Sequence, residues 1–410
     1  MPRVLLILPT GTYRAADFVR AASSLGVEVV VASEHRQAMA PLMADRAVVV
    51  PLARPEAAAE AVVELARRRP LDALVAVDEQ GVLVAALAGE RLGLAHNPPA
   101  AVAATRDKAA ARVALATAGV PQPTFRVVRS GDDVVVAARA VGLPCVVKPV
   151  SLSGSRGVIR ADDPAGVVAA AARARAILAD AGEDGDGPLL VESFVPGAEV
   201  ALEGLLRAGD LEVLALFDKP DPLDGPYFEE TIYVTPSRLS APVQEAVAEL
   251  VAAGAAALGL REGPVHAEVR VAGESVRLLE VAARSIGGMC SRALRFGAGI
   301  SLEEVILRHA LGLALGDLRR EGPASGVMML PIPRSGVLGE VRCVDAARSV
   351  PGVEGVELTI ARGRPVRELP EGDRYLGFVF ARGPTPAAVE ESLRRAHACL
   401  EVDIDDAGAV

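Results

Sequence analysis

The chain has 410 residues, of which 51% are hydrophobic, so it is too long for one hydrophobic core and indicates two or three domains. Its formal net charge of −10 argues against a nucleic-acid partner, because basic patches supply most of the affinity for nucleic acids. The N-terminal apolar run is too short for a signal peptide, and no stretch reaches about 18 uncharged apolar residues, so we expect no membrane partner and a cytoplasmic protein.

The first 95 residues alternate between short β-branched runs and Ala-rich helical segments. The runs are RVLLIL, VEVVVAS, RAVVV and ALVAV, and PEAAAEAVVELARRR has a helical period. This alternation predicts an α/β domain over residues 1–95 with a doubly wound parallel sheet. The TGT turn after the first run has a single glycine, so it is not a dinucleotide-binding fingerprint.

A second unit follows the punctuating segment HNPPAA at residues 96–101. Strands then come in adjacent pairs, as in LLVESF followed by AEVALEGLLRAGDLEVLALF. Such pairs indicate antiparallel hairpins packed with helices, and we predict an α+β domain over residues 96–320. From residue 321 the strand-like runs GVMMLPI, VELTI and YLGFVFA and the helical PAAVEESLRRAHACL predict a smaller C-terminal lobe, residues 321–410.

The four cysteines are far apart and include no C-x-x-C pair, which excludes a zinc ribbon and a disulfide framework. We expect Cys145, Cys290, Cys343 and Cys399 to be buried thiols in a reducing compartment.

Two lysines of the second unit are candidates for binding an anion. Lys148 ends the run PCVVKPV and is followed by SLSGSRGV, whose serines and glycines can turn several backbone N–H groups toward phosphate oxygens. An ordinary turn between strands would explain the same residues. Lys108 opens a helix that Gly119 closes, and a cation at a helix N-terminus opposes the helix dipole. An anionic ligand would explain the lysine at this position; a surface lysine that falls there by chance is the alternative.

The segment HAEVRVAGESVRLLEVAARSIGG places carboxylates in two otherwise apolar strand-like runs. If the AGES loop leaves an odd number of residues unpaired, Glu268 lies opposite Glu280, and two carboxylates so close need a cation such as Mg²⁺ between them. An even loop would put them on opposite faces as ordinary solvated acids. The polar, Pro-rich segment KPDPLDGPYFEETIYVTPS is long enough to be functional, and Lys219 at its start should lie near the reacting groups.

In this order and spacing, these residues resemble the ATP-grasp carboxylate–amine ligases. The segments LPIPRSGVL, YLGFVFARGPTPAAVEESLRRAH and KPDPLDGPYFEETIYVTPS are similar to the L-amino-acid ligase and carnosine synthase branch. The resemblance implies an ATP-grasp fold of α/β and α+β parts, ATP with Mg²⁺ or Mn²⁺ as cofactors, and small-molecule carboxylate and amine substrates. Because dimers are common in this family, it also suggests a homodimer.

The resemblance also implies a role for individual positions. ATP would be bound by Lys108, Lys148, the loop residues Ser151, Ser153, Gly154, Ser155 and Gly157, the adenine-reading residues Glu192, Ser193, Phe194 and Val195, and the ribose-binding Glu199. The metal carboxylates would be Glu268 and Glu280. The catalytic residues would be Arg284, Gly287 and Lys219, and the substrate contacts Glu230, Tyr233 and Arg284.

The expected reaction is activation of a carboxylate, that of an amino acid, as an acyl phosphate, which an amine then converts to an amide or dipeptide. A biotin-carboxylase-like enzyme is the alternative, but Ser-Ile-Gly-Gly-Met follows Arg284 instead of that family's Gln-Val-Glu-His. A non-catalytic nucleotide-binding module would be expected to lack metal or phosphate ligands. The chain departs from related patterns at Ala282, where many ATP-grasp enzymes have Asn, and at Tyr233, where bacilysin-type ligases have His. For Arg284, a structural ion pair with an acid such as Glu280 is the competing interpretation.

Overall fold

A parallel four-stranded sheet in the order β3-β2-β1-β4 forms the N-terminal part of the protein in a computed structural model, which describes residues 1–35 and 46–406. Alternate side chains of β1 face opposite layers: Leu6 packs with Phe18 of α1, whereas Leu5 packs with Val62 of α3. The predicted doubly wound parallel sheet is therefore confirmed, and its strands coincide with the four β-branched runs. The described elements are β1 (Arg3–Ile7), α1 (Ala15–Ser24), β2 (Glu28–Ser33), β3 (Ala47–Val49), α3 (Pro55–Arg68), β4 (Ala73–Ala76), η2 (Glu79–Gly81) and α4 (Val82–Leu92).

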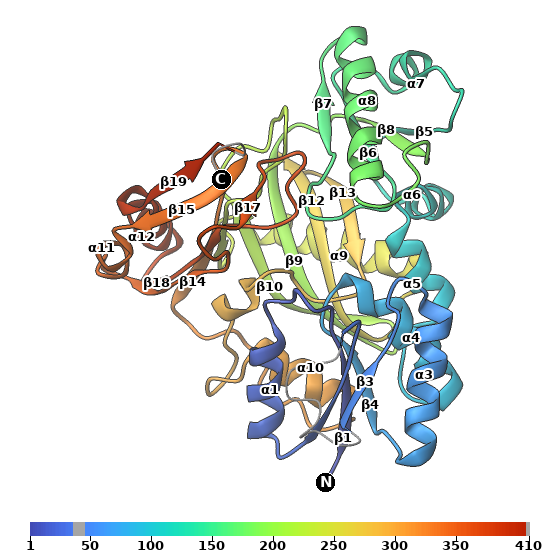
Figure 1. The fold of residues 1–410 in the computed structure, drawn as a ribbon, viewed down its shortest axis with the longest axis vertical. Helices are drawn as coiled ribbons and strands as arrows, with labels where there is room; N and C mark the ends of the chain where they lie inside the picture. The colour runs from blue at the N-terminus through green and yellow to red at the C-terminus, as the bar shows by residue number, and fades with distance from the viewer. Residues whose placement is uncertain (36–45, 407–410) are drawn as a thin grey trace.

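Two short helices, α5 (Pro99–Arg106) and α6 (Lys108–Thr117), lead from this domain into a small lobe (Figure 1). As expected, Lys108 opens α6, whose N-cap Asp107 accepts hydrogen bonds from the N–H groups of Ala109 and Ala110. The lobe is an antiparallel sheet in the order β5-β8-β6-β7 with two helices packed on one face. Its elements are β5 (Phe125–Val128), α7 (Val134–Val141), β6 (Cys145–Pro149), β7 (Ile159–Ala161), α8 (Pro164–Asp180) and β8 (Leu189–Ser193).

The centre of the molecule is an eight-stranded sheet in the order β13-β12-β9-β10-β11-β14-β18-β16, antiparallel at every pairing. The predicted hairpin over AEVALEGLLRAGDLEVLALF is β9 with β10, but LLVESF does not pair with it, because β8 belongs to the sheet of the small lobe. The elements of this part are β9 (Ala198–Arg207), β10 (Asp210–Lys219), β11 (Ile232–Thr235), α9 (Ala241–Leu258), β12 (Gly263–Ala272), β13 (Ser275–Ala282), η3 (Cys290–Ala293) and α10 (Leu302–Ala310).

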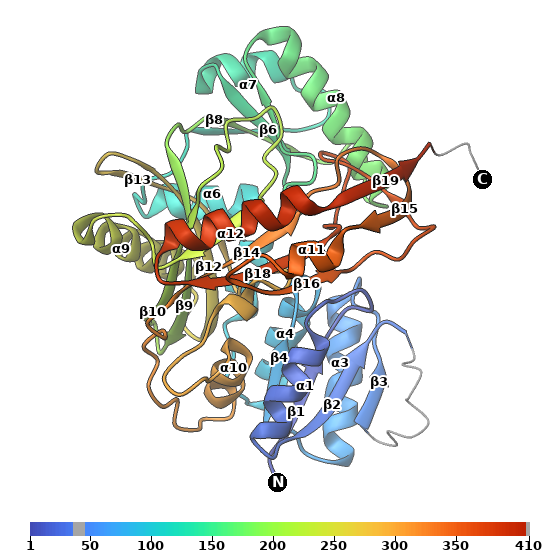
Figure 2. The same cartoon turned by 90° about the vertical axis from the view of Figure 1, so that its left-hand side faces the viewer.

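The C-terminal strands β14, β18 and β16 continue this central sheet, and α12 crosses their outer face (Figure 2). The three strand runs and the last helix expected beyond residue 321 are all present. The boundaries 1–95, 96–320 and 321–410 stay a prediction, since β11 and β14 pair across the last of them. The elements are β14 (Ala324–Leu330), β15 (Gly336–Arg342), α11 (Val344–Arg348), β16 (Val353–Leu358), β17 (Pro365–Val366), β18 (Gly377–Gly383), α12 (Pro386–Cys399) and β19 (Glu401–Asp405).

Helix α9 is long and apolar enough to cross a membrane, but its apolar residues have another explanation in this fold. Val247, Leu250 and Val251 are buried in the core between α9 and strands β9, β12 and β13. The expectation of four buried thiols is only partly right. All four cysteines are free, Cys145 and Cys290 are buried, Cys399 is partly exposed, and Cys343 is exposed because it precedes the short surface helix α11.

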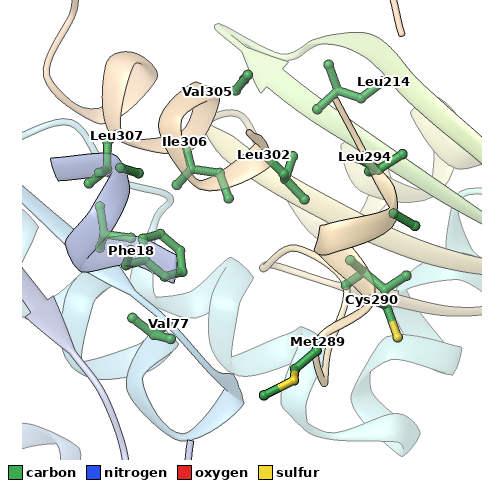
Figure 3. Close-up of a cluster of buried hydrophobic side chains, with 14 of the residues drawn as sticks. Phe18, Val77, Leu214, Met289, Cys290, Leu294, Leu302, Val305, Ile306 and Leu307 are labelled. Atoms are coloured by element: carbon green, nitrogen blue, oxygen red, sulfur yellow. The ribbon is translucent and has the colours of Figure 1, made fainter. Parts of the chain in front are cut away.

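One hydrophobic cluster joins the N-terminal domain to the rest of the chain (Figure 3). Phe18 of α1 and Val77 after β4 lie in the same cluster as Met289, Leu302 and Ile306, all of them buried. The N-terminal domain therefore packs on the segment that follows β13, in which Arg284 was predicted to act.

Candidate active site

A single cavity of about 840 Å³ is bounded by the N-terminal domain, the small lobe and the central sheet. It collects residues that are up to 366 positions apart in the chain, from Pro9 of the N-terminal domain to Tyr375 of the C-terminal lobe. The predicted site residues that line it are Lys108, Lys148, Ser153, Gly154, Ser155, Glu192, Ser193, Phe194, Val195, Glu199, Glu230, Tyr233, Glu268, Glu280, Arg284 and Gly287.

Three predicted residues lie outside the lining. Ser151 donates a short hydrogen bond to Glu183 on the outer side of its loop. The N–H of Gly157 donates to the carbonyl of Pro370 at 2.9 Å, so this end of the loop is tied to the C-terminal lobe. Lys219 is buried directly behind the cavity wall. Between these ends, left-handed backbone at Gly154 (φ +66) and Ser155 (φ +56) turns the loop beside the cavity.

A buried chain of charges supports the wall formed by β6 and β8. Glu192 accepts from Lys148 Nζ at 2.7 Å and from Arg112 Nε at 2.5 Å. Burial alone would raise the pKa of Glu192, but Arg112 and Lys148 outweigh it and lower that pKa to about 2. The carboxylate expected to read adenine is therefore already engaged, and it acts as the link between the two cations.

Lys148 remains short of negative charge despite this partner. Burial lowers its pKa, and the nearby Arg112 and Lys108 add to that effect against the attraction of Glu192. Lys108 Nζ donates to the carbonyl of Leu152 at 2.6 Å and lies 3.8 Å from Glu280. Two lysines thus face one cavity: Lys148 shares the charge of Glu192 with Arg112, and Lys108 makes only the longer contact with Glu280.

Glu268 and Glu280 are directly opposed on the β12–β13 hairpin, as predicted, but for a different reason. The loop is even: Ala272 pairs with Ser275, which leaves two residues unpaired. A β-bulge then shifts the register between Glu268 and Val269, so that Leu279 is the extra residue and both carboxylates reach the same face. The bulged strand also exposes carbonyl oxygens, and Leu279 accepts from Arg112 Nη2 at 2.7 Å.

Lys219 is surrounded by carboxylates beneath the cavity. Its Nζ donates to Glu199 at 2.7 Å, to Glu268 at 3.2 Å and, by a shorter contact, to Glu230. Burial would lower the pKa of Lys219, but the three acids raise it well above its ordinary value. Burial and Glu268 raise the pKa of Glu230 to about 8, whereas Lys219 holds Glu268 below its ordinary range. The ammonium stays charged and occupies the centre of this acidic group.

Two sets of carboxylates, which share Glu268, differ in how well they suit a hard divalent ion such as Mg²⁺. Among the described residues, Glu199, Glu230 and Glu268 are close enough to share an ion, with ligand atoms within 4.8 Å of one another, but Lys219 already supplies their positive charge. The opposed pair of Glu268 and Glu280 offers oxygen ligands that face the cavity, which is the chemistry that Mg²⁺ prefers.

Arg284 leaves β13 and points into the cavity. Its Nε donates to Glu79 of the N-terminal domain at 2.8 Å, and its Nη1 donates to the carbonyl of Ser285 at 2.9 Å. Burial would lower its pKa, but Glu79 and Glu280 raise it. The competing interpretation from the sequence was an ion pair with an acid such as Glu280; Arg284 does form an ion pair, but its partner is Glu79, and Glu280 lies near Lys108.

Phe194 forms part of the wall where adenine was predicted to bind. Its ring lies between the guanidinium groups of Arg160 and Arg270, whose carbons are 4.4 and 5.7 Å from the ring centroid. Tyr233 is buried, and Lys219 Nζ lies 5.0 Å from its ring centroid, so this tyrosine packs against the cation at the centre of the acidic group.

Sequence reasoning missed three charged residues that build the site. Arg14 is buried and contacts the segment after Arg284, Glu79 holds Arg284, and Arg112 holds Glu192. Each lies in an Ala-rich or strand-end context that reads as ordinary surface. The only available signal is position: Glu79 follows the carboxyl end of the parallel strand β4, where doubly wound sheets bind ligands.

Comparison with family models gives three consecutive matches. Residues 19–96 match an ATP-grasp N-terminal domain, residues 141–293 an ATP-grasp domain, and residues 328–405 the L-amino acid ligase C-terminal domain 2. The chain is 24% identical to an L-amino acid ligase from Bacillus licheniformis of known structure, with a TM-score of 0.82 and 99% of both chains covered.

Curated proteins of two kinds are similar to this chain in sequence. The chain is 25% identical to alanine–anticapsin ligase of Bacillus subtilis over 269 residues, which is 62% of this chain and 56% of that protein. It is 28% identical to formate-dependent phosphoribosylglycinamide formyltransferase of Nitratidesulfovibrio vulgaris over 400 residues, which is 93% of this chain and 92% of that protein. The chain spans less than two thirds of the length of the first curated relatives that it matches.

Proposed function

Because this chain is an ATP-grasp protein with an L-amino-acid-ligase type of C-terminal domain, we propose that it is an ATP-dependent carboxylate–amine ligase. It would convert the carboxylate of an amino acid to an acyl phosphate and couple it to an amine, releasing ADP and phosphate. The observation that carries the proposal is the convergence of Lys108, Lys148, Glu268, Glu280 and Arg284 on one cavity.

Each group has a task that its surroundings support. Lys108 and Lys148 would hold the phosphates of ATP, since both face the cavity and Lys148 shares its carboxylate partner Glu192 with Arg112. Mg²⁺, or Mn²⁺, held by Glu268 and Glu280, would neutralise phosphate charge when bound. Arg284 would stabilise the charge that spreads over the transferred phosphoryl group and the acyl phosphate.

The first bond forms between a substrate carboxylate oxygen and the γ-phosphorus of ATP, and the bond from that phosphorus to ADP breaks. The nitrogen of the neutral amine then forms a bond to the acyl carbon, the bond from that carbon to the phosphate oxygen breaks, phosphate leaves, and the nitrogen gives up one proton to water. The acyl phosphate must be kept from water in between. The Ser153–Ser155 turn and the Glu230–Tyr233 segment flank the cavity and would shield it.

Arg284→Ala tests the assignment of the central residue. We expect ATP affinity close to that of the parent protein and a loss of about 10²- to 10³-fold in amide formation, the scale for removal of one oxyanion donor. Arg284→Lys should restore the activity only partly, because a point charge lacks the guanidinium fork. Melting temperature, ATP affinity and turnover are measured on the same protein. A fall in turnover that only matches the loss of folded protein would assign the arginine a structural role.

Substrates are found by an ATP-dependent phosphate-release screen of amino acids, singly and in pairs. Formate is included, because the relation to a formate-dependent formyltransferase extends over nearly the whole chain and favours another acid as the alternative substrate. A biotin-carboxylase-like reaction is tested in the same screen with bicarbonate. Absence of phosphate release with every acid would contradict the proposed function.

We also propose a cytoplasmic location, which the four unpaired cysteines support. Partners would be small molecules, without a nucleic-acid or membrane surface. The homodimer expected from the family stays a prediction that sedimentation analysis checks.

A further inference from the structure

The N-terminal domain grips the polypeptide immediately after Arg284. Arg14, whose side chain is 1% exposed, donates from Nη1 to Ser285 Oγ at 2.8 Å and to the carbonyl of Ile286 at 3.0 Å. Its Nη2 donates to Glu303 Oε1 at 3.0 Å. The hydrophobic cluster in Figure 3 packs around the same segment, so the backbone that carries Arg284 is held by a different domain.

The side chain of Arg284 is held by that domain as well. Glu79 Oε2 accepts from Arg284 Nε, and the other oxygen of Glu79 lies 3.6 Å from Arg106 Nε at the end of α5. Glu79 thus lies between two arginines, one on each side. Glu79 also lines the cavity, so it fixes the orientation of the Arg284 guanidinium at the place where a ligand would bind.

The contacts of Arg284 leave one edge available. Nε is taken by Glu79 and Nη1 is shared with the carbonyl of Ser285, whereas Nη2 makes no hydrogen bond to any residue in ranges 1–35 and 46–406. Ordering an arginine side chain costs about 2 kcal/mol of rotamer entropy, so an unheld guanidinium would lose that orientation. Arg284 lines the cavity, as Glu79 does.

We propose that Glu79 is a positioning residue that orients Arg284 for the reaction, with Arg14 fixing the backbone of the same loop. The inference rests on the proposed function for its effect on turnover, but its structural part does not. It assigns the N-terminal domain a part in the chemistry beyond covering the cavity. Glu79 acts through Arg284 and contributes no bond to the reacting atoms.

Glu79→Ala and Glu79→Gln test the inference together. Removal of a residue that orients a functional side chain costs about 10- to 100-fold in activity, so we expect kcat to fall by that factor in Glu79→Ala while the KM for ATP changes little. Glu79→Gln keeps a hydrogen-bond acceptor and should recover most of the loss. Glu28→Ala is the matched control, since Glu28 pairs with Arg69 in the same domain on the side away from the cavity.

A double substitution distinguishes positioning from an independent role. If Glu79 acts only through Arg284, adding Glu79→Ala to Arg284→Ala should lower kcat by less than about twofold, because interacting residues are not additive. A full additional loss would overturn the inference. So would kcat in Glu79→Ala equal to that of Glu28→Ala.

Hydrogen exchange gives a measurement that does not depend on the reaction. In Glu79→Ala the amides of residues 284–288 should exchange faster than in the parent and in Glu28→Ala, since the loop loses one of its attachments to the N-terminal domain. Unchanged exchange together with unchanged kcat would refute the positioning role while the proposed function stands. A parent protein without ligase activity in the substrate screen would refute the proposed function, and the exchange result would still decide whether Glu79 holds the loop.

Discussion

Replacement of Arg112 by Met should destabilise the protein strongly, although Arg112 contacts no expected ligand. Its side chain is 3% exposed and pairs with Glu192, which is equally buried. Met keeps the aliphatic volume and removes the charge. Glu192 would then keep Lys148 as its only cation and would stay in a site from which water is excluded.

The magnitude follows from the carboxylate. Its pKa falls from 4.5 to about 2 in the folded protein, which at about 1.4 kcal/mol per pH unit corresponds to about 3 kcal/mol as the net effect of its cations and of burial, which opposes them. Breaking a buried ion pair by removing one partner costs about 3–5 kcal/mol. We therefore expect Arg112→Met to lower the free energy of unfolding by about 3 kcal/mol at pH 7.

The sign of the pH dependence is fixed by the direction of the pKa change. The folded state lowers the pKa of Glu192, so its stabilisation is complete above pH 4.5 and is lost as the pH falls toward about 2. The difference between parent and Arg112→Met should shrink over the same range. Urea unfolding followed by circular dichroism at pH 7, 5 and 3 measures it.

Arg238→Met is the matched control, because Arg238 also forms ion pairs, with Asp218 and Glu390, but its side chain is 44% exposed. Exposed pairs contribute about 0–1 kcal/mol. Equal losses in the two variants, or a loss in Arg112→Met that does not change with pH, would refute the buried-charge reasoning.

Three further outcomes are expected. Lys148→Ala should weaken ATP binding by about 1.5–3 kcal/mol in calorimetry, the range for a charge-assisted hydrogen bond, and an unchanged affinity would remove Lys148 from the phosphate site. Glu280→Gln should raise the Mg²⁺ concentration for half-maximal activity about tenfold or more, and an unchanged requirement would mean that Glu280 is no ligand. Lys219→Met leaves Glu199, Glu230 and Glu268 without their common cation, so the variant should bind one more Mn²⁺ than the parent by electron paramagnetic resonance; equal stoichiometry would show that the acids respond by taking up protons.

The sequence allows prediction of elements whose signals are local. The four β-branched runs of the N-terminal sheet, the β9–β10 hairpin and the helix opened by Lys108 are each specified by residues within about a dozen positions. The positions of Lys148 and Glu268 at the cavity also follow from such signals, together with the family resemblance.

Register and distant partners could not be predicted in that way. An even number of unpaired residues in the AGES loop would put Glu268 and Glu280 on opposite faces, but the bulge at Leu279 brings them to the same face. No pattern in the sequence of the two strands marks Leu279 as the extra residue. Arg284 and Glu79 are 205 residues apart, and Arg14 and Glu303 are 289 apart. Their pairing depends on how the N-terminal domain docks on the rest of the chain, and apolar packing contributes to that docking.

Two carboxylates at the cavity are each shared between two cations. Glu192 divides its charge between Lys148 and the deeper Arg112, and Glu79 divides its charge between Arg284 and Arg106. Each cation at the wall is thereby held in place but only partly neutralised, because its acid is shared. Lys219 is the opposite case, since three acids surround it, and it contributes no free positive charge. An anion entering the cavity therefore meets Lys148 and Arg284 before it meets Lys219. Substitution of Arg112 or Arg106 should lower the free energy of unfolding by more than it lowers the free energy of anion binding.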